Sequence, residues 1–255
     1  MLQERRRKII DLIKEKKVIK VNELMEMFNI SIETVRRDLE SLEKEGYLNR
    51  VYGGAVLRTS YGTEPDFYKR EVEHLNEKKA IAQAALEFIQ NGDTLFLDVG
   101  TTILELAKCI KENRSVTVLT NSLKVSMLLS ESPGITVIML GGVVRPNEFS
   151  TSGFLAEENL QRFNADKAFI GVGGITPDGW ITDFNINEAN LRRQMIANAQ
   201  NVIALADSSK FGVKAMNKIC KCEDINILIT DTSASQKDIE FFEKTGLKVI
   251  QCKSE

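Results

Sequence analysis

From residue 75 onward, short apolar runs alternate with stretches whose apolar residues recur at helical spacing, and this alternation constrains the fold more than any other feature. The apolar runs predict strands at residues 94–98, 116–120, 135–140, 167–172, 202–206, 225–230 and 248–251. The stretches between them predict helices at residues 76–90, 102–111, 123–130, 155–162, 187–199 and 236–245. Strands that are separated by helices pair in the same direction, so we expect an α/β domain with a mainly parallel sheet covered on both faces.

The first 58 residues follow a different pattern, with three short amphipathic helices predicted at residues 3–16, 21–28 and 32–45. Asn29 provides a turn between the second and third helices, because Asn tolerates the left-handed conformation. Ser31 is suited to cap the third helix, and Gly46 to end it. Two extended pieces follow up to Ala55 and suit a β-wing, so this region is predicted to be a winged helix-turn-helix.

The third helix has one apolar side, formed by Ile32, Val35, Leu39 and Leu42, and one polar side. A rotation of about 100° per residue turns Thr34 and Arg37 away from the apolar side and leaves Arg36 on the flank. Such groups at the start of a recognition helix can bond phosphates and base edges in the major groove of DNA. The alternative is a helical bundle whose arginines are only solvated, and periodicity alone leaves it open.

Charge is divided unevenly along the chain. Residues 1–58 carry 13 Lys and Arg against 10 Asp and Glu, whereas the remaining residues carry a net charge of −5. A basic segment on an acidic body favours an anionic partner for the N-terminal part. The excess alone does not establish one, since a solvated face has the same composition.

Several functional classes are excluded by what the chain lacks. Its longest mostly apolar run spans residues 135–144, too short for the roughly 17–25 residues of a membrane span, and no signal peptide is recognisable, so we expect a cytoplasmic protein without membrane contact. The four cysteines have no zinc-site spacing, and His74 is the only histidine. We therefore expect no metal, no cofactor and no histidine-based catalysis.

Polar and glycine-rich residues follow several predicted strands, where the ligands of a parallel sheet collect. The first strand runs into Asp98-Val99-Gly100-Thr101-Thr102, whose glycine, hydroxyls and helix start can hold a phosphate. Later strand ends carry Asn121, the pair Gly141 and Gly142, and Lys210, which can pair with the same anion. Together they favour a pocket for an anionic small molecule, although each alone is also explained as a turn or a helix cap. The run from Gly171 to Gly174 lacks the third glycine of a dinucleotide fingerprint.

With these motifs in place, the chain resembles the DeoR family of bacterial transcriptional regulators over nearly its full length. The N-terminal resemblance rests on Ser31-Ile-Glu-Thr34-Val35-Arg36-Arg37-Asp38-Leu39 and on Arg50-Val-Tyr-Gly53-Gly54-Ala55. The C-terminal resemblance rests on Asp98-Val-Gly-Thr-Thr102, Thr120-Asn121-Ser122, Gly141-Gly142, Glu188-Ala189 and Asp207-Ser-Ser-Lys210-Phe-Gly212.

The resemblance implies an N-terminal all-α winged helix-turn-helix at residues 1–58, a linker at 59–74, and at 75–255 an α/β sensor similar to ribose-phosphate isomerase. It implies a repressor of sugar or polyol utilisation genes that binds double-stranded operator DNA as a homodimer or homotetramer and is controlled by a phosphorylated sugar. The implied DNA contacts are Ser31, Thr34, Arg36, Arg37 and Arg50. The implied effector contacts are Asp98, Gly100, Thr101, Thr102, Asn121, Gly141, Gly142 and Lys210, with Asp183 and Glu188 contacting hydroxyls.

A working sugar-phosphate isomerase fused to a DNA-binding module is the alternative. The related isomerases use an acidic loop, and the matching positions here read Gly171-Val-Gly-Gly174-Ile175. The position of the isomerase base falls on Arg192, which cannot accept a proton at neutral pH. We therefore expect a sensor without catalytic residues. A C-terminal half that serves only dimerisation would leave the polar strand ends unexplained.

Overall fold

The computed structural model describes residues 2–16, 18–44, 47–57 and 64–254, and the chain divides into two units, Met1–Ser60 and Tyr61–Glu255. The first unit contains α1 (Leu2–Lys16), β1 (Val18–Lys20), α2 (Val21–Phe28), α3 (Ile32–Lys44), β2 (Leu48–Val51) and β3 (Gly54–Leu57). The strands form an antiparallel sheet in the order β1-β3-β2, with β2 and β3 as the expected wing. Strand β1 was not predicted, because three residues are too few to establish a period.

Local sequence signals fix the ends of the helices in this unit. Asn29 has a φ of 49°, so it ends α2 in the left-handed conformation expected of the turn. The Ser31 hydroxyl accepts a hydrogen bond of 3.3 Å from the Thr34 amide and caps α3. The apolar faces of α1, α2 and α3 meet in one buried core around Ile13, Leu24 and Leu39. The expected helix end at Gly46 lies outside the described residues.

The second unit is built on a seven-stranded sheet in the order β15-β14-β12-β9-β4-β5-β6, in which every neighbouring pair is parallel. Its strands are β4 (Thr94–Leu97), β5 (Thr117–Thr120), β6 (Thr136–Met139), β9 (Ala165–Gly171), β12 (Ala199–Leu205), β14 (Ile227–Asp231) and β15 (Lys248–Cys252). Its helices are α4 (Phe67–Val72), α5 (Leu75–Leu86), α6 (Thr101–Asn113), α7 (Leu123–Ser130), α8 (Phe154–Leu160), α9 (Ile186–Ala197) and α10 (Gln236–Lys244). The predicted parallel α/β architecture is confirmed.

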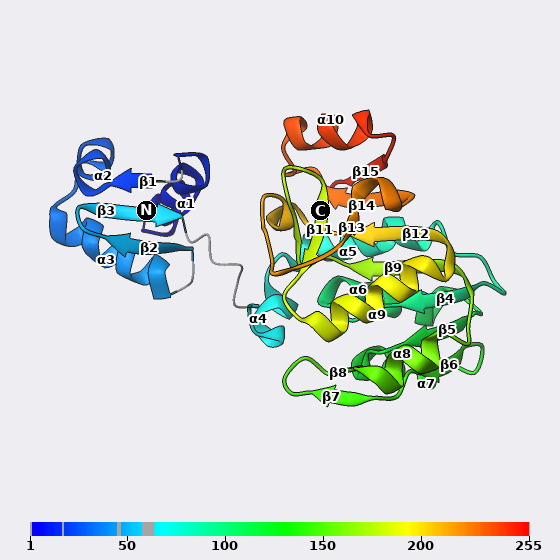
Figure 1. Cartoon of the computed structure of the whole chain (residues 1–255). Coiled ribbons are helices and arrows are strands. Elements are labelled where there is room, and N and C mark those ends of the chain that lie inside the picture. Colours follow the sequence, from blue (N-terminus) through cyan, green and yellow to red (C-terminus); the bar gives the residue numbers. More distant parts are fainter. Residues whose placement is uncertain (1, 17, 45–46, 58–63, 255) are drawn as a thin grey trace. The chain divides into compact units, whose positions relative to one another are not determined.

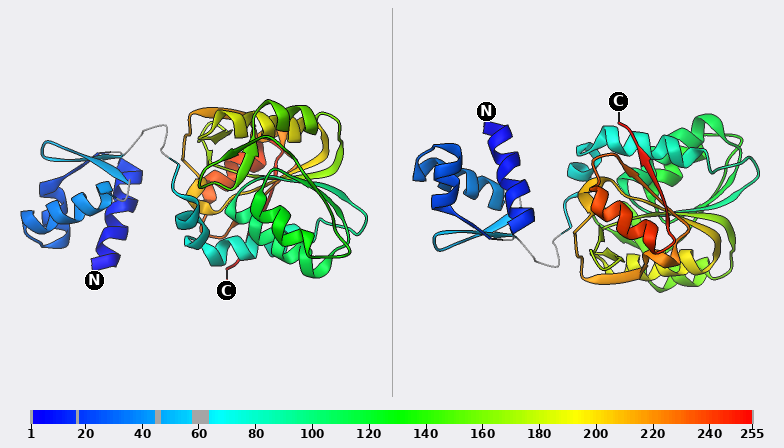
Figure 2. Two further views of the ribbon diagram at one scale, coloured as in Figure 1. Left: turned by 90° about the horizontal axis from the view of Figure 1, so that it is seen from below. Right: turned by 90° about the horizontal axis from the view of Figure 1, so that it is seen from above.

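Helices cover both faces of this sheet (Figures 1 and 2). One buried core joins α5, α6 and α7 to sheet residues such as Leu95 and Leu97, and a second joins α8, α9 and α10 to residues such as Phe96. Successive strand residues point to opposite faces, so Leu95, Phe96 and Leu97 enter the two cores in turn. No helix of the described residues is long and apolar enough to cross a membrane.

Two small sheets were not predicted. One is antiparallel, with the order β10-β11-β13, and contains β10 (Gly174–Ile175), β11 (Trp180–Asp183) and β13 (Asn217–Lys221). The other is the hairpin of β7 (Val143–Arg145) and β8 (Ser150–Ser152). These strands are short and their sequences mix polar and apolar residues, so only their tertiary pairing defines them.

The stretch expected to be a linker, residues 59–74, contains helix α4 at residues 67–72. Asp66 caps the helix by accepting a hydrogen bond of 2.9 Å from the Tyr68 amide. Phe67 is buried and packs edge-on against Phe149, with ring centroids 5.6 Å apart. A cap and one buried aromatic side chain thus order a stretch whose composition is polar. Residues 59–63 lie outside the described residues.

Candidate functional site

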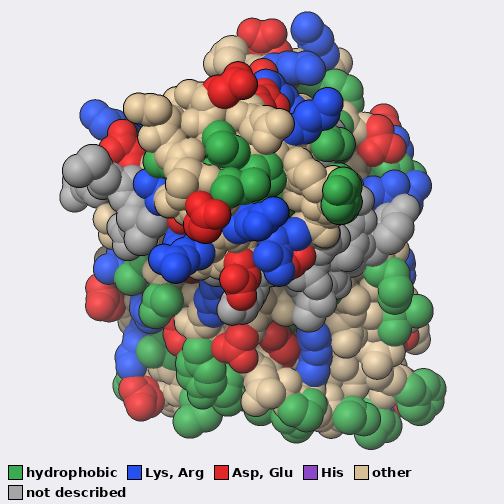
Figure 3. Space-filling model, turned by 90° about the vertical axis from the view of Figure 1, so that its left-hand side faces the viewer, with side chains coloured by type: hydrophobic (Ala, Val, Ile, Leu, Met, Phe, Trp, Pro, Cys, Tyr) green, Lys and Arg blue, Asp and Glu red, His purple; other side chains and the backbone are tan. Residues whose placement is uncertain are grey.

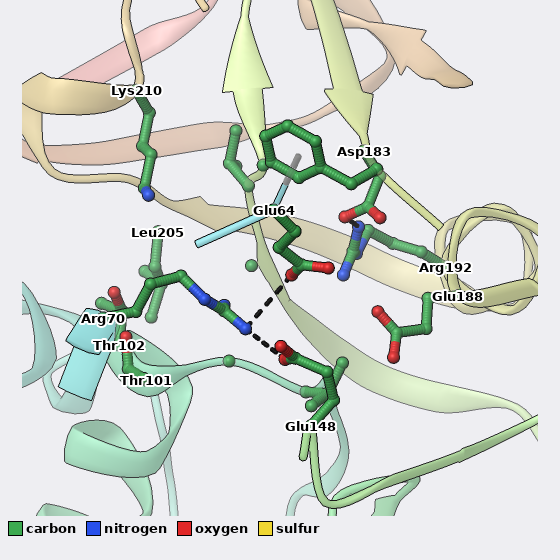
Figure 4. A pocket seen from close by; sticks show the side chains of 16 residues that line it. Glu64, Arg70, Thr101, Thr102, Glu148, Asp183, Glu188, Arg192, Leu205 and Lys210 are labelled. Carbon is green, nitrogen blue, oxygen red and sulfur yellow. Dashed lines mark hydrogen bonds and ion pairs between the residues drawn. The ribbon is translucent and has the colours of Figure 1, made fainter. Parts of the chain in front are cut away.

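A pocket lies at the carboxyl ends of β4, β9 and β12 (Figure 4). In the sheet, β5 and β6 lie on one side of β4, and β9, β12, β14 and β15 lie on its other side, so the strand order reverses at β4. Ligands of open α/β sheets bind at such a reversal of strand order. The lining residues are Glu64, Arg70, Val99, Gly100, Thr101, Thr102, Glu148, Gly171, Val172, Gly173, Asp183, Phe184, Glu188, Arg192, Leu205 and Lys210.

One side of the pocket is the N-terminus of α6. Gly100 has a φ of 149°, which favours glycine at this helix start. The Leu104 amide donates to the Gly100 carbonyl at 3.0 Å, so the three amides before it have no partner within the helix. The hydroxyls of Thr101 and Thr102 make no hydrogen bond to a described residue, although both side chains are largely buried. The result is a cluster of free donors at the positive end of a helix dipole.

Lys210 brings a positive charge to this pocket, and its ammonium group points into the open space in Figure 4. It lies in the short 3₁₀ helix Ser208–Lys210, which Asp207 caps by accepting a hydrogen bond of 3.0 Å from the Ser209 amide. Burial would raise the pKa of Asp207, but Lys210 and the Ser209 hydroxyl lower it below its usual value. No hydrogen bond or ion pair joins the Lys210 ammonium to another described residue, so it is available to an anion.

Beneath the pocket, Arg192 is buried between two carboxylates. Its Nε donates to Asp98, and its Nη1 donates to Asp183 Oδ2 at 2.5 Å. Asp98 also accepts a hydrogen bond of 3.0 Å from the Gly171 amide. Burial alone would lower the pKa of Arg192, but the two aspartates raise it above its ordinary value. The guanidinium therefore stays charged and cannot accept a proton as a general base would.

The opposite wall of the pocket is a network of ion pairs. Arg70 bonds Glu148 and lies 3.1 Å from Glu64 Oε1 (Figure 4). Arg145 donates to Glu64 Oε2 at 2.7 Å and to Glu188 Oε2 at 2.9 Å. The sequence analysis missed all of these residues except Glu188. Glu64 and Arg70 lie in the supposed linker, and Arg145 and Glu148 lie beside Pro146 in a stretch without periodicity, so no local signal marks them.

The residues expected to contact the effector divide into two groups. Gly100, Thr101, Thr102, Asp183, Glu188 and Lys210 line the pocket, and Asp98 lies at its base through Arg192. Asn121, Gly141 and Gly142 are not among the lining residues. Hairpin β7–β8 contacts two of them: the Thr151 amide donates to the Asn121 carbonyl at 2.8 Å, and a Cβ at Gly142 would lie 2.6 Å from the Ser152 carbonyl oxygen.

A second candidate surface is the polar side of α3. Arg36 and Arg37 are exposed and make no hydrogen bond or ion pair with a described residue, whereas Val35 and Leu39 are buried on the opposite side. The Ser31 and Thr34 hydroxyl oxygens lie 3.1 Å apart beside them. Lys and Arg side chains gather near the middle of the face drawn in Figure 3, with Asp and Glu side chains around them. The start of α3 therefore offers free cationic donors.

The wing residue Arg50, which the resemblance implies as a DNA contact, is bonded to another side chain of the protein. Arg50 donates from its Nε to Glu43 Oε2 at 2.7 Å, and its amide donates to the other oxygen of the same carboxylate. Its guanidinium is therefore already engaged in this structure. Tyr52, at the turn between β2 and β3, is fully exposed. Sequence reasoning did not single out Tyr52.

Models of two known protein domains match the two units of this chain. The DeoR-like helix-turn-helix domain matches residues 5–61, and the DeoR C terminal sensor domain matches residues 73–232. Among solved structures, ribose 5-phosphate isomerase A from Methanocaldococcus jannaschii covers 55% of this chain and is itself covered over 56%, with 18% identity and a TM-score of 0.41.

Curated relatives match nearly the whole chain. The HTH-type transcriptional regulator YulB of Bacillus subtilis is 36% identical over 98% of this chain and 96% of its own length. The glycerol-3-phosphate regulon repressor of Escherichia coli is 32% identical over 89% of this chain and 90% of its own length. Regulator and repressor names of this kind confirm the regulator interpretation over the isomerase alternative. The chain belongs to the DeoR family of transcriptional regulators.

Proposed function

We propose that this regulator represses sugar or polyol utilisation genes and that a phosphorylated sugar or polyol binds its sensor pocket. The observation that carries the proposal is the corner formed by Thr101, Thr102 and Lys210, where free helix amides, two hydroxyls and an unpaired ammonium meet. A phosphate dianion satisfies all of these groups at once. Asp183 and Glu188, on the far side, have the carboxylate oxygens that accept bonds from sugar hydroxyls.

Operator recognition is assigned to α3 of the domain at residues 1–58. Arg36 and Arg37 would contact base edges or phosphates, Ser31 and Thr34 would contact the backbone, and Arg50 would contribute from the wing after exchanging Glu43 for a phosphate. The proposed partner of this domain is duplex DNA. The proposed location of the protein is the cytoplasm. The sensor domain is proposed to begin before residue 75, because α4 packs within the second unit.

The test combines two measurements on the full chain. A duplex is first selected from random-sequence DNA by repeated binding. Its affinity is then measured with and without fructose 1-phosphate, fructose 6-phosphate, glucose 6-phosphate, glycerol 3-phosphate and ribose 5-phosphate. Thermal unfolding with the same compounds reports binding directly, because a ligand at about 100 times its Kd stabilises the folded state by about 2.7 kcal/mol. A chain that neither selects a duplex nor binds any of these compounds contradicts the proposal.

We also propose assembly into a homodimer or homotetramer. Operators commonly mirror the two-fold symmetry of their proteins. The sensor exposes large apolar side chains on neighbouring elements, with Val143 on β7 72% exposed and Phe154 on α8 74% exposed. Such a patch is typical of an interface between protein chains. Light scattering coupled to size-exclusion chromatography decides the oligomeric state, and a monomeric chain contradicts this part of the proposal.

A further inference from the structure

Glu64 is a carboxylate held inside the effector pocket by two arginines. Arg145 donates to Glu64 Oε2 at 2.7 Å, and Arg70 lies 3.1 Å from Glu64 Oε1. The Glu64 side chain is 12% exposed, and it is one of the residues that line the pocket. Two guanidinium groups around one carboxylate are the arrangement with which proteins bind the anionic or oxygen-rich part of a ligand. Glu64 therefore occupies a binding position rather than a packing position.

The charges of the pocket make this carboxylate easy to replace. Its neighbours include three further carboxylates, those of Glu148, Asp183 and Glu188. Burial raises the pKa of Glu64, and the neighbouring Glu148 raises it further against the opposing effect of Arg70. The ionised Glu64 side chain is thus less stable in the pocket than its two arginine partners alone would suggest. A ligand oxygen that satisfies Arg70 and Arg145 would relieve this repulsion.

Helix α4, which directly follows, is held in place by contacts that do not involve Glu64. Phe67 is buried against Phe149, and the Lys124 ammonium lies 4.3 Å from the centre of the Phe67 ring. The Lys78 ammonium donates to the carbonyls of Arg70 and Glu73, which holds the C-terminal end of the helix. Arg70 can therefore stay in the pocket when Glu64 leaves it.

We propose that Glu64 is an internal occupant of the effector site: the effector takes its place on Arg70 and Arg145. This inference rests on the proposed function, because it requires a ligand in that pocket. It assigns Arg70 and Arg145 as effector-binding residues. The ligand group that they receive is a sugar carbonyl, hydroxyl or carboxylate at the end away from the phosphate.

The first experiment compares three full-length proteins: wild type, Glu64→Gln and Asp66→Asn. Asp66 is the matched control, because it is exposed and Asn preserves its capping of α4. The five sugar and polyol phosphates named above and inorganic phosphate are titrated calorimetrically. We expect Glu64→Gln to bind at least one of the five on the order of tenfold more tightly than wild type, because one charge-assisted competitor is weakened. Asp66→Asn should bind like wild type, and inorganic phosphate should gain less than the organic ligand.

Two results overturn the inference and differ in what they say about the proposed function. If wild type binds one of the five compounds and Glu64→Gln binds it equally or more weakly, Glu64 is a ligand contact or a bystander, and the proposed function survives. If neither protein binds any of them, the proposed function fails together with the inference.

Amide hydrogen exchange gives a second test, because the proposal predicts faster exchange in one region of the chain and slower exchange in another. In wild type with a saturating sugar phosphate, amide exchange should rise in peptides that contain Glu64 and fall in peptides covering residues 100–104. Glu64→Gln without ligand should already show part of the rise. Slower exchange in both regions on ligand binding would mean that Glu64 stays in the pocket, which contradicts displacement.

Discussion

The guanidinium of Arg192 and the carboxylate of Asp183 meet at 2.5 Å in the interior of the sensor, where each side chain is at most 6% exposed. Asp98, which directly follows β4 of the main sheet, completes a buried triad with the same arginine. One cation thus links the end of β4, strand β11 and helix α9 beneath the effector pocket.

Replacing Arg192 should destabilise the fold strongly. Arg192→Met leaves two buried carboxylates without their cation, and breaking a buried ion pair in this way costs about 3–5 kcal/mol. Urea denaturation of the full chain measures the loss. Arg193→Met is the control, because Arg193 is exposed and, among the described residues, bonds Asn190 and the Lys218 carbonyl rather than a buried carboxylate. Equal stability of the two variants would show that the triad contributes nothing special.

Truncating the α3 arginines should weaken binding to the selected duplex. Arg37→Ala removes a side chain opposite the buried Val35 and Leu39, so the packing of the helix should be undisturbed. Loss of a bidentate contact to guanine costs roughly 1–3 kcal/mol and relaxes specificity at one base pair. Gel-shift titration at fixed salt gives the affinity, with the exposed Arg162→Ala as the control. Unchanged affinity in both Arg36→Ala and Arg37→Ala would reject α3 as the recognition helix.

A carboxylate at the start of α6 should separate sensing from DNA binding. Thr101→Asp is compatible with the helix N-terminus but repels a phosphate there, at a cost of several kcal/mol in ligand affinity. The variant should bind the selected duplex normally and stop responding to sugar phosphates. Thr101→Asn has a similar shape without the charge and should retain more of the response. A wild-type effector response in Thr101→Asp would place the phosphate elsewhere.

The sensor should not interconvert sugar phosphates. Arg192 is locked between two aspartates and stays protonated, so it cannot take a proton from a substrate carbon. Coupled assays with ribose 5-phosphate and glucose 6-phosphate should show only background turnover. Turnover that disappears in Lys210→Ala would identify this pocket as an active site and reverse the conclusion.

Stability should depend on the protonation of Lys78. Burial lowers the pKa of Lys78 from 10.5 to about 8. Between these values the unfolded chain keeps a proton that the folded chain has lost, so the free energy of unfolding rises with pH across this window. The wild type should therefore gain stability relative to Lys78→Met between about pH 8 and about pH 10.5 in urea denaturation. Lys79, the exposed neighbour, provides the control. If wild type gains the same stability relative to Lys79→Met, the gain does not come from the protonation of Lys78.

Much of the architecture follows from local sequence. The alternation of apolar runs and amphipathic stretches predicted all seven strands of the main sheet, because the period of the side chains reflects which faces are buried. Asn29 and Ser31 predicted the turn before α3 and the cap of α3, since both act on their own backbone. The strand-end residues Thr101, Thr102 and Lys210 could be expected in one pocket, because parallel strands end at one edge.

The residues that form the opposite wall of that pocket could be identified only from the tertiary structure. Glu64 and Arg145 are 81 positions apart, and Asp98 and Arg192 are 94 positions apart. Ion pairs act through space and leave no period in the sequence, so nothing near Glu64 or Arg70 marks them as pocket residues. The same holds for hairpin β7–β8, whose pairing buries Asn121 away from the pocket that its strand-end position suggested. Local sequence determined the framework because periodicity and capping are local, whereas the polar network depends on which distant segments the framework brings together.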